Sequence, residues 1–235
     1  MKVIRKRCAQ GAQGAKGIAV IIDVFRAFSC EPFFFHFNAA KIILEARREK
    51  AVSLKEHHPD WILVGEHNEV PLHGADLGNS PSEILKKGEP FFRHRTVVHR
   101  TTAGVTGAAA AIDTADEVLL GSFLTAGATA RYIRRKSPDR VTLVAMGERA
   151  RKPAPEDEAC ATNLECLLTD RPYDHLKSLA DILFQPTAQK FIQGQKPYLP
   201  REDPIICLQQ DLFDFALIAK REAGEIIVER KIATV

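Results

Sequence analysis

An acidic and a basic residue stand at the end of the most apolar segment near the start of the chain. The run Ile18–Ile22 is wholly apolar, Asp23 follows it at once, and Arg26 comes three residues later. Such a run predicts a buried strand, and ligands of open α/β sheets bind at the carboxyl ends of the strands. We therefore expect Asp23 and Arg26 at a ligand site, with a structural ion pair as the alternative.

A second polar segment, Gly74–Glu83, leads from a loop into an expected helix. Its last part, Ser80–Glu83, has the residue types of an N-cap, a first-turn proline and a capping box. Capping does not explain Asp76 or Asn79. A helix start that follows a glycine turn can bind anions. Asp76 is accordingly a candidate catalytic residue and Asn79 a candidate substrate ligand, although Asp76 could simply close a turn.

Donors suited to an anion gather in the segment Arg100–Gly104, between an expected strand and the next helix. A guanidinium, two hydroxyls and free backbone amides can together surround an anionic group. Helix capping by the threonines is the alternative here, and a small residue in a tight turn is the alternative for Ser122. The predicted substrate-binding residues are Arg26, Asn79, Arg100, Thr101, Thr102, Gly104 and Ser122.

Five blocks of the sequence, in this order, resemble the magnesium-dependent 2-phosphosulfolactate phosphatase family. They are IIDVFRA at 21–27, GADLGNSP at 74–81, RTTAG at 100–104, GSFLTA at 121–126 and EDEACA at 156–161. DLGNSP and GSFL are the most specific of these, and the likeness spans most of the chain up to about residue 168. The resemblance implies magnesium-dependent hydrolysis of a small phosphorylated acid.

Removing a phosphate requires neutralising the phosphoryl oxygens and activating a nucleophile, and Mg²⁺ with a few carboxylates is suited to both. Mg²⁺ prefers six oxygen ligands and keeps several waters, so carboxylates from separate loops suffice. Stabilisation of a helix start is the alternative for the two acids that follow Pro155. The candidate metal ligands are Asp23, Glu66, Glu156 and Asp157.

Three neutral positions depart from the pattern that this family usually shows. Ala103 stands in place of an asparagine, Val105 in place of a threonine and Thr125 in place of an asparagine. Because such changes remove polar contacts, a non-catalytic protein that binds an anion in the same charged site is the rival hypothesis.

Alternating strand-like and helix-like segments indicate an α/β fold with three layers, in which helices cover both faces of a mixed, largely parallel sheet. A single phosphatase-like domain over 1–235 is expected. The expected strands are Ile18–Ile22, Trp61–Val64, Thr96–His99, Glu117–Leu120, Val141–Ala145 and Glu225–Val228. The expected helices are Cys30–Glu49, Ser80–Lys87, Val105–Ile112, Thr125–Lys136, Glu156–Leu168, Tyr173–Ile192 and Asp211–Lys220.

The phenylalanines of the run Phe33–Phe37 cannot all lie on one side of a helix. Burial between two layers would explain them, and so would a contact between copies of the chain in a homo-oligomer.

Charge and composition exclude several classes of protein. The chain has 235 residues, 33 of them basic and 30 acidic, and this balance does not indicate nucleic-acid binding; the basic residues near position 5 are expected in a solvated tail. The five cysteines form no C-x-x-C pair, which argues against a disulfide framework and a zinc site. No apolar run reaches membrane-spanning length, and we expect a cytoplasmic protein.

The site hypothesis predicts convergence in space. If the candidates bind one metal and one small dianion, they must share a cleft, whereas residues that only cap helices would scatter. The residues expected to meet are Asp23, Arg26, Asp76, Thr101, Thr102, Glu156 and Asp157.

Overall fold

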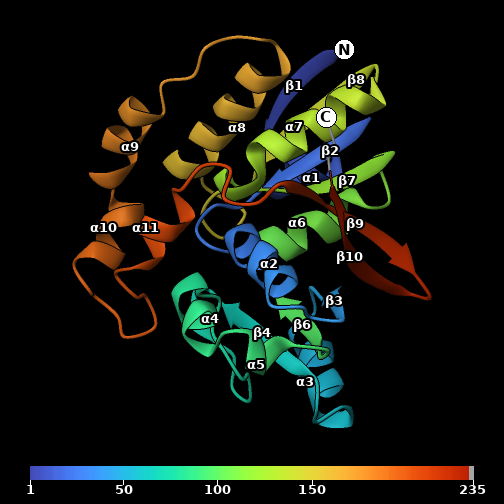
Figure 1. Cartoon of the computed structure of the whole chain (residues 1–235), viewed down its shortest axis with the longest axis vertical. Helices are drawn as coiled ribbons and strands as arrows, with labels where there is room; N and C mark the ends of the chain where they lie inside the picture. Colours follow the sequence, from blue (N-terminus) through green and yellow to red (C-terminus); the bar gives the residue numbers. More distant parts are fainter. Residues whose placement is uncertain (233–235) are drawn as a thin grey trace.

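One ten-stranded sheet runs through the part of the chain that the computed structural model describes, residues 1–232 (Figure 1). The strand order is β1-β8-β2-β7-β9-β10-β3-β6-β4-β5. The strands are β1 Lys2–Arg7, β2 Ile18–Ile22, β3 Lys41–Leu44, β4 Ile62–His67, β5 Val70–Pro71, β6 Thr96–Arg100, β7 Glu117–Gly121, β8 Arg140–Ala145, β9 Phe215–Glu222 and β10 Glu225–Ile232.

The sheet consists of two parallel groups joined by an antiparallel hairpin. Strands pair in parallel within β1-β8-β2-β7 and within β3-β6-β4. The hairpin β9–β10 pairs antiparallel with β7 on one side and with β3 on the other. Three antiparallel pairings, β7–β9, β9–β10 and β10–β3, therefore lie between the groups, and the strands of one group run in the opposite direction to those of the other.

Helices cover both faces of the sheet, because successive side chains of its strands point to opposite faces and both faces are apolar. In β2, Val20 packs in a cluster with Leu164 of α8, whereas Ile21 packs in a second cluster with Phe28 of α2. This arrangement confirms the expected three-layer α/β fold with a mixed, largely parallel sheet.

The helices differ in length, and within residues 1–232 none has the length and apolar character needed to cross a membrane. They are α1 Cys8–Gln13, α2 Ala27–His36, α3 Arg48–His57, α4 Pro81–Lys87, α5 Glu89–Phe92, α6 Gly104–Ala111, the 3₁₀ helix η1 Phe123–Thr125, α7 Ala126–Lys136, α8 Pro155–Leu168, α9 His175–Leu183, α10 Pro186–Ile192 and α11 Asp203–Cys207.

Two predicted helices are wrong because strand pairing decides the structure of their segments. The expected helix Cys30–Glu49 is divided into α2, the strand β3 and the start of α3, and β3 is buried between β6 and β10. The expected helix Asp211–Lys220 is largely replaced by β9, which lies between β7 and β10. Such partners become available only in the folded sheet, and they override local helix propensity.

Two other segments also differ from expectation. The basic N-terminal residues form the edge strand β1, where Arg5 and Arg7 pair with Glu158 of α8 at 2.9 and 2.6 Å, instead of a solvated tail. The helix expected over Tyr173–Ile192 is two helices, α9 and α10, and the second begins at Pro186.

The aromatic run of α2 packs within the chain. Phe33 lies edge-on to Phe213 with 5.1 Å between ring centroids, and Phe34 lies 5.5 Å from Phe92. Phe35 contacts Phe215 at 6.2 Å. Burial between layers therefore accounts for these side chains without a second copy of the chain.

Buried Asp203 fastens the C-terminal helices to the segments near the end of β2. Its Oδ2 accepts a hydrogen bond of 2.8 Å from Arg26 Nη1, and its Oδ1 accepts one of 2.8 Å from Ser80 Oγ and one of 3.1 Å from the Ser82 amide. The Asp203 side chain is fully buried and that of Arg26 is 4% exposed. A single carboxylate thus connects α11, the start of α4 and Arg26.

Removing this carboxylate should destabilise the protein strongly. Asp203→Ala leaves the Arg26 charge and two donors buried without a partner, and we expect a loss of about 3–5 kcal/mol in the free energy of unfolding. Asp214→Ala is the control, because its ion pair with Arg131 lies at the surface and contributes at most about 1 kcal/mol. Equilibrium urea unfolding measures both, and equal losses would contradict the anchoring role of Asp203.

Candidate active site

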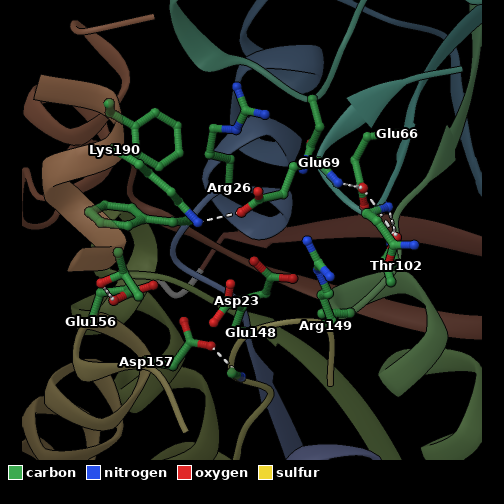
Figure 2. A pocket seen from close by; sticks show the side chains of 17 residues that line it. Asp23, Arg26, Glu66, Glu69, Thr102, Glu148, Arg149, Glu156, Asp157 and Lys190 are labelled. Carbon is green, nitrogen blue, oxygen red and sulfur yellow. Dashed lines mark hydrogen bonds and ion pairs between the residues drawn. The ribbon is translucent and has the colours of Figure 1, made fainter. Parts of the chain in front are cut away.

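A pocket lies where the carboxyl ends of both strand groups meet (Figure 2). Asp23 follows β2 and Gly147 follows β8 in one group, whereas Glu66 lies near the end of β4 and Thr102 follows β6 in the other. The lining residues are Asp23, Phe25, Arg26, Glu66, Asn68, Glu69, Asn79, Thr102, Ala103, Gly147, Glu148, Arg149, Glu156, Asp157, Thr187, Lys190 and Phe191.

One wall of the pocket carries three buried carboxylates, Asp23, Glu156 and Asp157, which are 6%, 4% and 3% exposed. Burial raises the pKa of Asp23 to about 6 and that of Glu156 to about 7. Burial also raises the pKa of Asp157 well above its usual value, and the charges of the other two acids raise it further. Within residues 1–232 none of the three forms a salt bridge, so this wall favours a bound cation or retained protons.

Backbone amides hold the acidic wall in place. Asp157 Oδ1 accepts a hydrogen bond of 2.7 Å from the Val24 amide, and its Oδ2 accepts one of 2.7 Å from the Gly147 amide. Asp157 therefore joins the end of β2 to the end of β8. Glu156 Oε2 accepts a hydrogen bond of 2.9 Å from Thr187 Oγ1 of α10.

Gly104 has a steric role beside this wall. A Cβ atom at this position would lie 2.8 Å from Asp23 Oδ2 and 2.8 Å from the Ala27 Cβ, so only glycine lets α6 start this close to Asp23. Hydrogen bonds from the Ala27 and Gly104 amides lower the pKa of Asp23 and partly offset its desolvation. Gly104 contributes to the site through this backbone approach.

The opposite wall is organised by Glu66. Its oxygens accept hydrogen bonds from the Thr102 amide at 2.5 Å, the Glu69 amide at 2.5 Å and Thr102 Oγ1 at 3.1 Å. Glu66 lines the pocket as expected, but its two oxygens are occupied in positioning the Thr102 loop.

A buried relay orients Asn79 at the pocket. Asn79 Oδ1 lies 3.0 Å from His99 Nε2, and an amide oxygen can only accept, so His99 donates there. On the other side of the ring, His99 Nδ1 lies 2.5 Å from Glu31 Oε1. Because the relay occupies its oxygen, Asn79 retains its Nδ2 hydrogens for a ligand.

Cationic side chains border the pocket at its helical side. Arg26 Nη1 bonds to Asp203 and, at 3.2 Å, to the Tyr198 carbonyl, and the guanidinium carbon lies 5.3 Å from the centre of the Phe191 ring. Lys190 of α10 forms an ion pair with Glu69, as Figure 2 shows. The charges of Arg26 and Lys190 are therefore both matched by carboxylates.

The expected convergence is wrong for Asp76. Its Oδ2 accepts a hydrogen bond of 2.8 Å from the Leu63 amide and lies 2.9 Å from Lys55 Nζ, and the residue does not line the pocket. Asp76 thus fixes the loop after β5 against β4, a structural role that differs from the turn closure named as the alternative, because its partners Leu63 and Lys55 lie outside its own turn.

Four predicted substrate ligands, Arg100, Thr101, Gly104 and Ser122, are not among the residues that line the pocket. Thr101 Oγ1 accepts a hydrogen bond of 3.0 Å from the Val105 amide and so caps α6. Arg100 Nη1 donates to the Glu66 carbonyl, and Ser122 is buried at the start of η1. Of the seven residues expected to meet, five line this pocket, namely Asp23, Arg26, Thr102, Glu156 and Asp157, whereas Asp76 and Thr101 do not line it.

Only one of the three neutral departures faces the pocket. Ala103 lines it, whereas Val105 and Thr125 are fully buried away from it. The side chains at the latter two positions therefore do not form part of the pocket wall.

Sequence reasoning missed several lining residues. Glu148 and Arg149 follow the expected strand Val141–Ala145, so the rule that selected Asp23 would also have selected them. Glu69 follows Glu66 in a turn, and Lys190 lies in a helix remote in sequence, where no local pattern indicates a site.

Comparisons of the sequence with known proteins point to one family. The model of a family described as 2-phosphosulpholactate phosphatase matches residues 5–221. A protein of Bacillus subtilis named "Probable 2-phosphosulfolactate phosphatase" is 27% identical over 92% of this chain and 92% of its own length. A protein of Caldanaerobacter subterraneus with the same name is 30% identical over 83% of this chain and 84% of its own length. A Deinococcus radiodurans protein, also so named, is 33% identical over 55% of this chain and 53% of its own length.

The acidic wall predicts how stability depends on pH. The folded protein holds protons on Asp23 and Glu156 at pH values where the unfolded chain has released them, so in chelator the free energy of unfolding should fall as pH rises, between about 3.8 and 6 for Asp23 and between about 4.5 and 7 for Glu156. The fall should approach about 1.4 kcal/mol per pH unit for each group. Urea unfolding of the wild type and of Glu156→Gln measures it, and the variant should show a shallower slope. Exposed Glu56→Gln is the control, and parallel slopes for all proteins would contradict this origin.

Proposed function

The chain belongs to the 2-phosphosulfolactate phosphatase family of phosphoric monoester hydrolases, and on that premise we propose that it is a magnesium-dependent phosphatase of small phosphorylated acids. The supporting observation is the wall formed by Asp23, Glu156 and Asp157, whose buried charges have no basic partner within residues 1–232. Desolvated carboxylates of this kind need a cation or protons to remain buried.

The donor chemistry of this wall fits Mg²⁺. Carboxylate oxygens are the ligands that Mg²⁺ prefers, and it commonly takes only one or two of them and completes its shell with water and phosphate oxygens. Within residues 1–232 no group of three or more His, Cys, Asp and Glu side chains is placed to hold a metal ion, so no more than two of the three wall carboxylates would bind one Mg²⁺ directly in this arrangement. Asp23, Glu156 and Asp157 would supply the carboxylates. A bound Mg²⁺ supplies positive charge that offsets the charge developing on the phosphoryl oxygens.

The remaining lining residues provide donors for the anion. Arg26 is held rigidly by Asp203 and Asn79 presents its Nδ2, whereas the Thr102 amide and hydroxyl already donate to Glu66. Fixed donors lower the barrier because they need no reorganisation as charge develops. In the overall reaction water adds to phosphorus, the ester P–O bond breaks and the departing alkoxide takes a proton.

The names of the relatives suggest the substrate. 2-Phosphosulfolactate carries a carboxylate and a sulfonate beside its phosphate, which suits a pocket that contains three cationic side chains, Arg26, Arg149 and Lys190. We therefore propose this compound, or a phosphorylated hydroxy acid of similar size, as the substrate.

A cytoplasmic location is part of the proposal. All five cysteines are free thiols and four of them are buried, which suits a reducing compartment.

Turnover should require both the metal and Asp23. Asp23→Asn removes a charge from the acidic wall, and we expect kcat/KM to fall about 100-fold or more, the scale on which positioned reactive groups act. Asp76→Asn is the matched control, because this aspartate lies outside the pocket, and it should retain activity. The measurement is phosphate release from 2-phosphosulfolactate and a panel of phosphorylated hydroxy acids with Mg²⁺ or with chelator.

Two outcomes would contradict the proposal. Turnover that persists in chelator would exclude the magnesium dependence. Saturable binding of an organophosphate in a thermal-shift assay, without hydrolysis after long incubation, would instead indicate a non-catalytic anion-binding protein.

A further inference from the structure

We propose that Arg149 binds the second acid group of the substrate and so selects phosphorylated acids over simple phosphate monoesters. This inference rests on the proposed phosphatase function and adds the residue that determines its specificity.

Arg149 lies in a short turn after β8 that is fastened to the acidic wall. The turn begins at Gly147, whose amide donates to Asp157 Oδ2 at 2.7 Å, while the Met146 amide donates to the Ile22 carbonyl at 3.0 Å. Figure 2 shows the Arg149 side chain rising into the pocket between Glu148 and Thr102. The residue is thus carried by the same strand ends that position Asp23 and Asp157.

The backbone of this turn is held in an uncommon conformation. Arg149 and Ala150 have φ angles of 53° and 58°, in the left-handed region that residues other than glycine rarely adopt. Hydrogen bonds between Glu148 and Lys152 close the turn, at 2.7 and 3.2 Å, and a Cβ atom on Gly147 would lie 2.0 Å from the Lys152 carbonyl oxygen. Such a conformation, held at the edge of a pocket, commonly serves to aim a functional side chain.

The charge of Arg149 is unmatched in the described part of the chain. Arg26 is paired with Asp203, and Lys190 is paired with Glu69. Arg149 forms no ion pair and no side-chain hydrogen bond with residues 1–232, even though Glu148 is its neighbour in sequence. Of the three pocket cations, it is therefore the one without a carboxylate partner, and its exposed side chain is accessible to a ligand.

An acid group is the ligand that would pair with the guanidinium of Arg149. In the proposed function the phosphate is bound by a cation on the carboxylate wall and by the donors Arg26 and Asn79. The planar guanidinium of Arg149 can hold two oxygens of a carboxylate or sulfonate at once. A substrate without such a group would leave this interaction unused.

The test compares phosphoglycolate, which has a carboxylate, with ethyl phosphate, which has none, in the presence of Mg²⁺. For Arg149→Gln we expect KM for phosphoglycolate to rise about 10- to 100-fold, with kcat little changed, because a charge-assisted bond is lost. Constants for ethyl phosphate should stay the same, and Arg149→Lys should restore part of the affinity for phosphoglycolate. Arg151→Gln is the matched control: this exposed arginine lies in the same turn but outside the pocket, and neither substrate should be affected.

Each other result has a distinct meaning. Equal losses on both substrates, or no loss on either, would overturn the role of Arg149 alone. Absence of turnover of both substrates and of 2-phosphosulfolactate by the wild type would overturn the phosphatase function and this inference with it. Thermal unfolding of each variant checks that the turn still folds.

Discussion

The burial of uncompensated negative charge is the constraint around which this protein is organised. Asp23, Glu156 and Asp157 lie almost entirely out of water and have no basic partner within residues 1–232. Desolvation of this kind is tolerated only where backbone amides and a cation or protons offset it. The amides of Val24, Gly147 and Ala27 fill the first part of that need, and these amides lie just beyond strand ends. The segments that follow the strands therefore supply the backbone amides that hold the acidic residues of the pocket.

The sheet topology explains why one pocket can combine so many segments. The two parallel groups run in opposite senses across the β9–β10 hairpin, and the pocket receives residues from the carboxyl ends of both. The C-terminal helices add Thr187, Lys190 and Phe191 and are anchored by buried Asp203. One group supplies Asp23 and the loop that holds Asp157, and the other supplies Glu66 and Thr102, so the acidic wall of the pocket faces a wall built from the other half of the sheet.

Sequence reasoning found the part of this site that depends on local rules. Asp23 stands where a buried strand must end, and Glu156 with Asp157 stands where a helix must begin, so burial and sequence position together mark them. The same local rules gave Asp76 and Thr101 each a functional and a structural interpretation. In the folded protein both side chains have structural roles. A turn residue and a ligand can have identical neighbours in sequence, because the difference lies in what the side chain meets after folding.

The sequence by itself determined the alternation of strands and helices, the family and the acidic residues of the site, since periodicity, caps and strand ends are short-range properties. Only the tertiary structure decided that the segments around β3 and β9 become strands, because their pairing partners lie far away in the chain. Tertiary structure also decided which cations are free. Arg26 meets Asp203, Lys190 meets Glu69 and Arg149 meets neither, and these pairings span up to 177 positions. Whether a charged pocket residue has a partner depends on residues that are far apart in sequence and that the fold brings together. No local sequence pattern therefore predicts it.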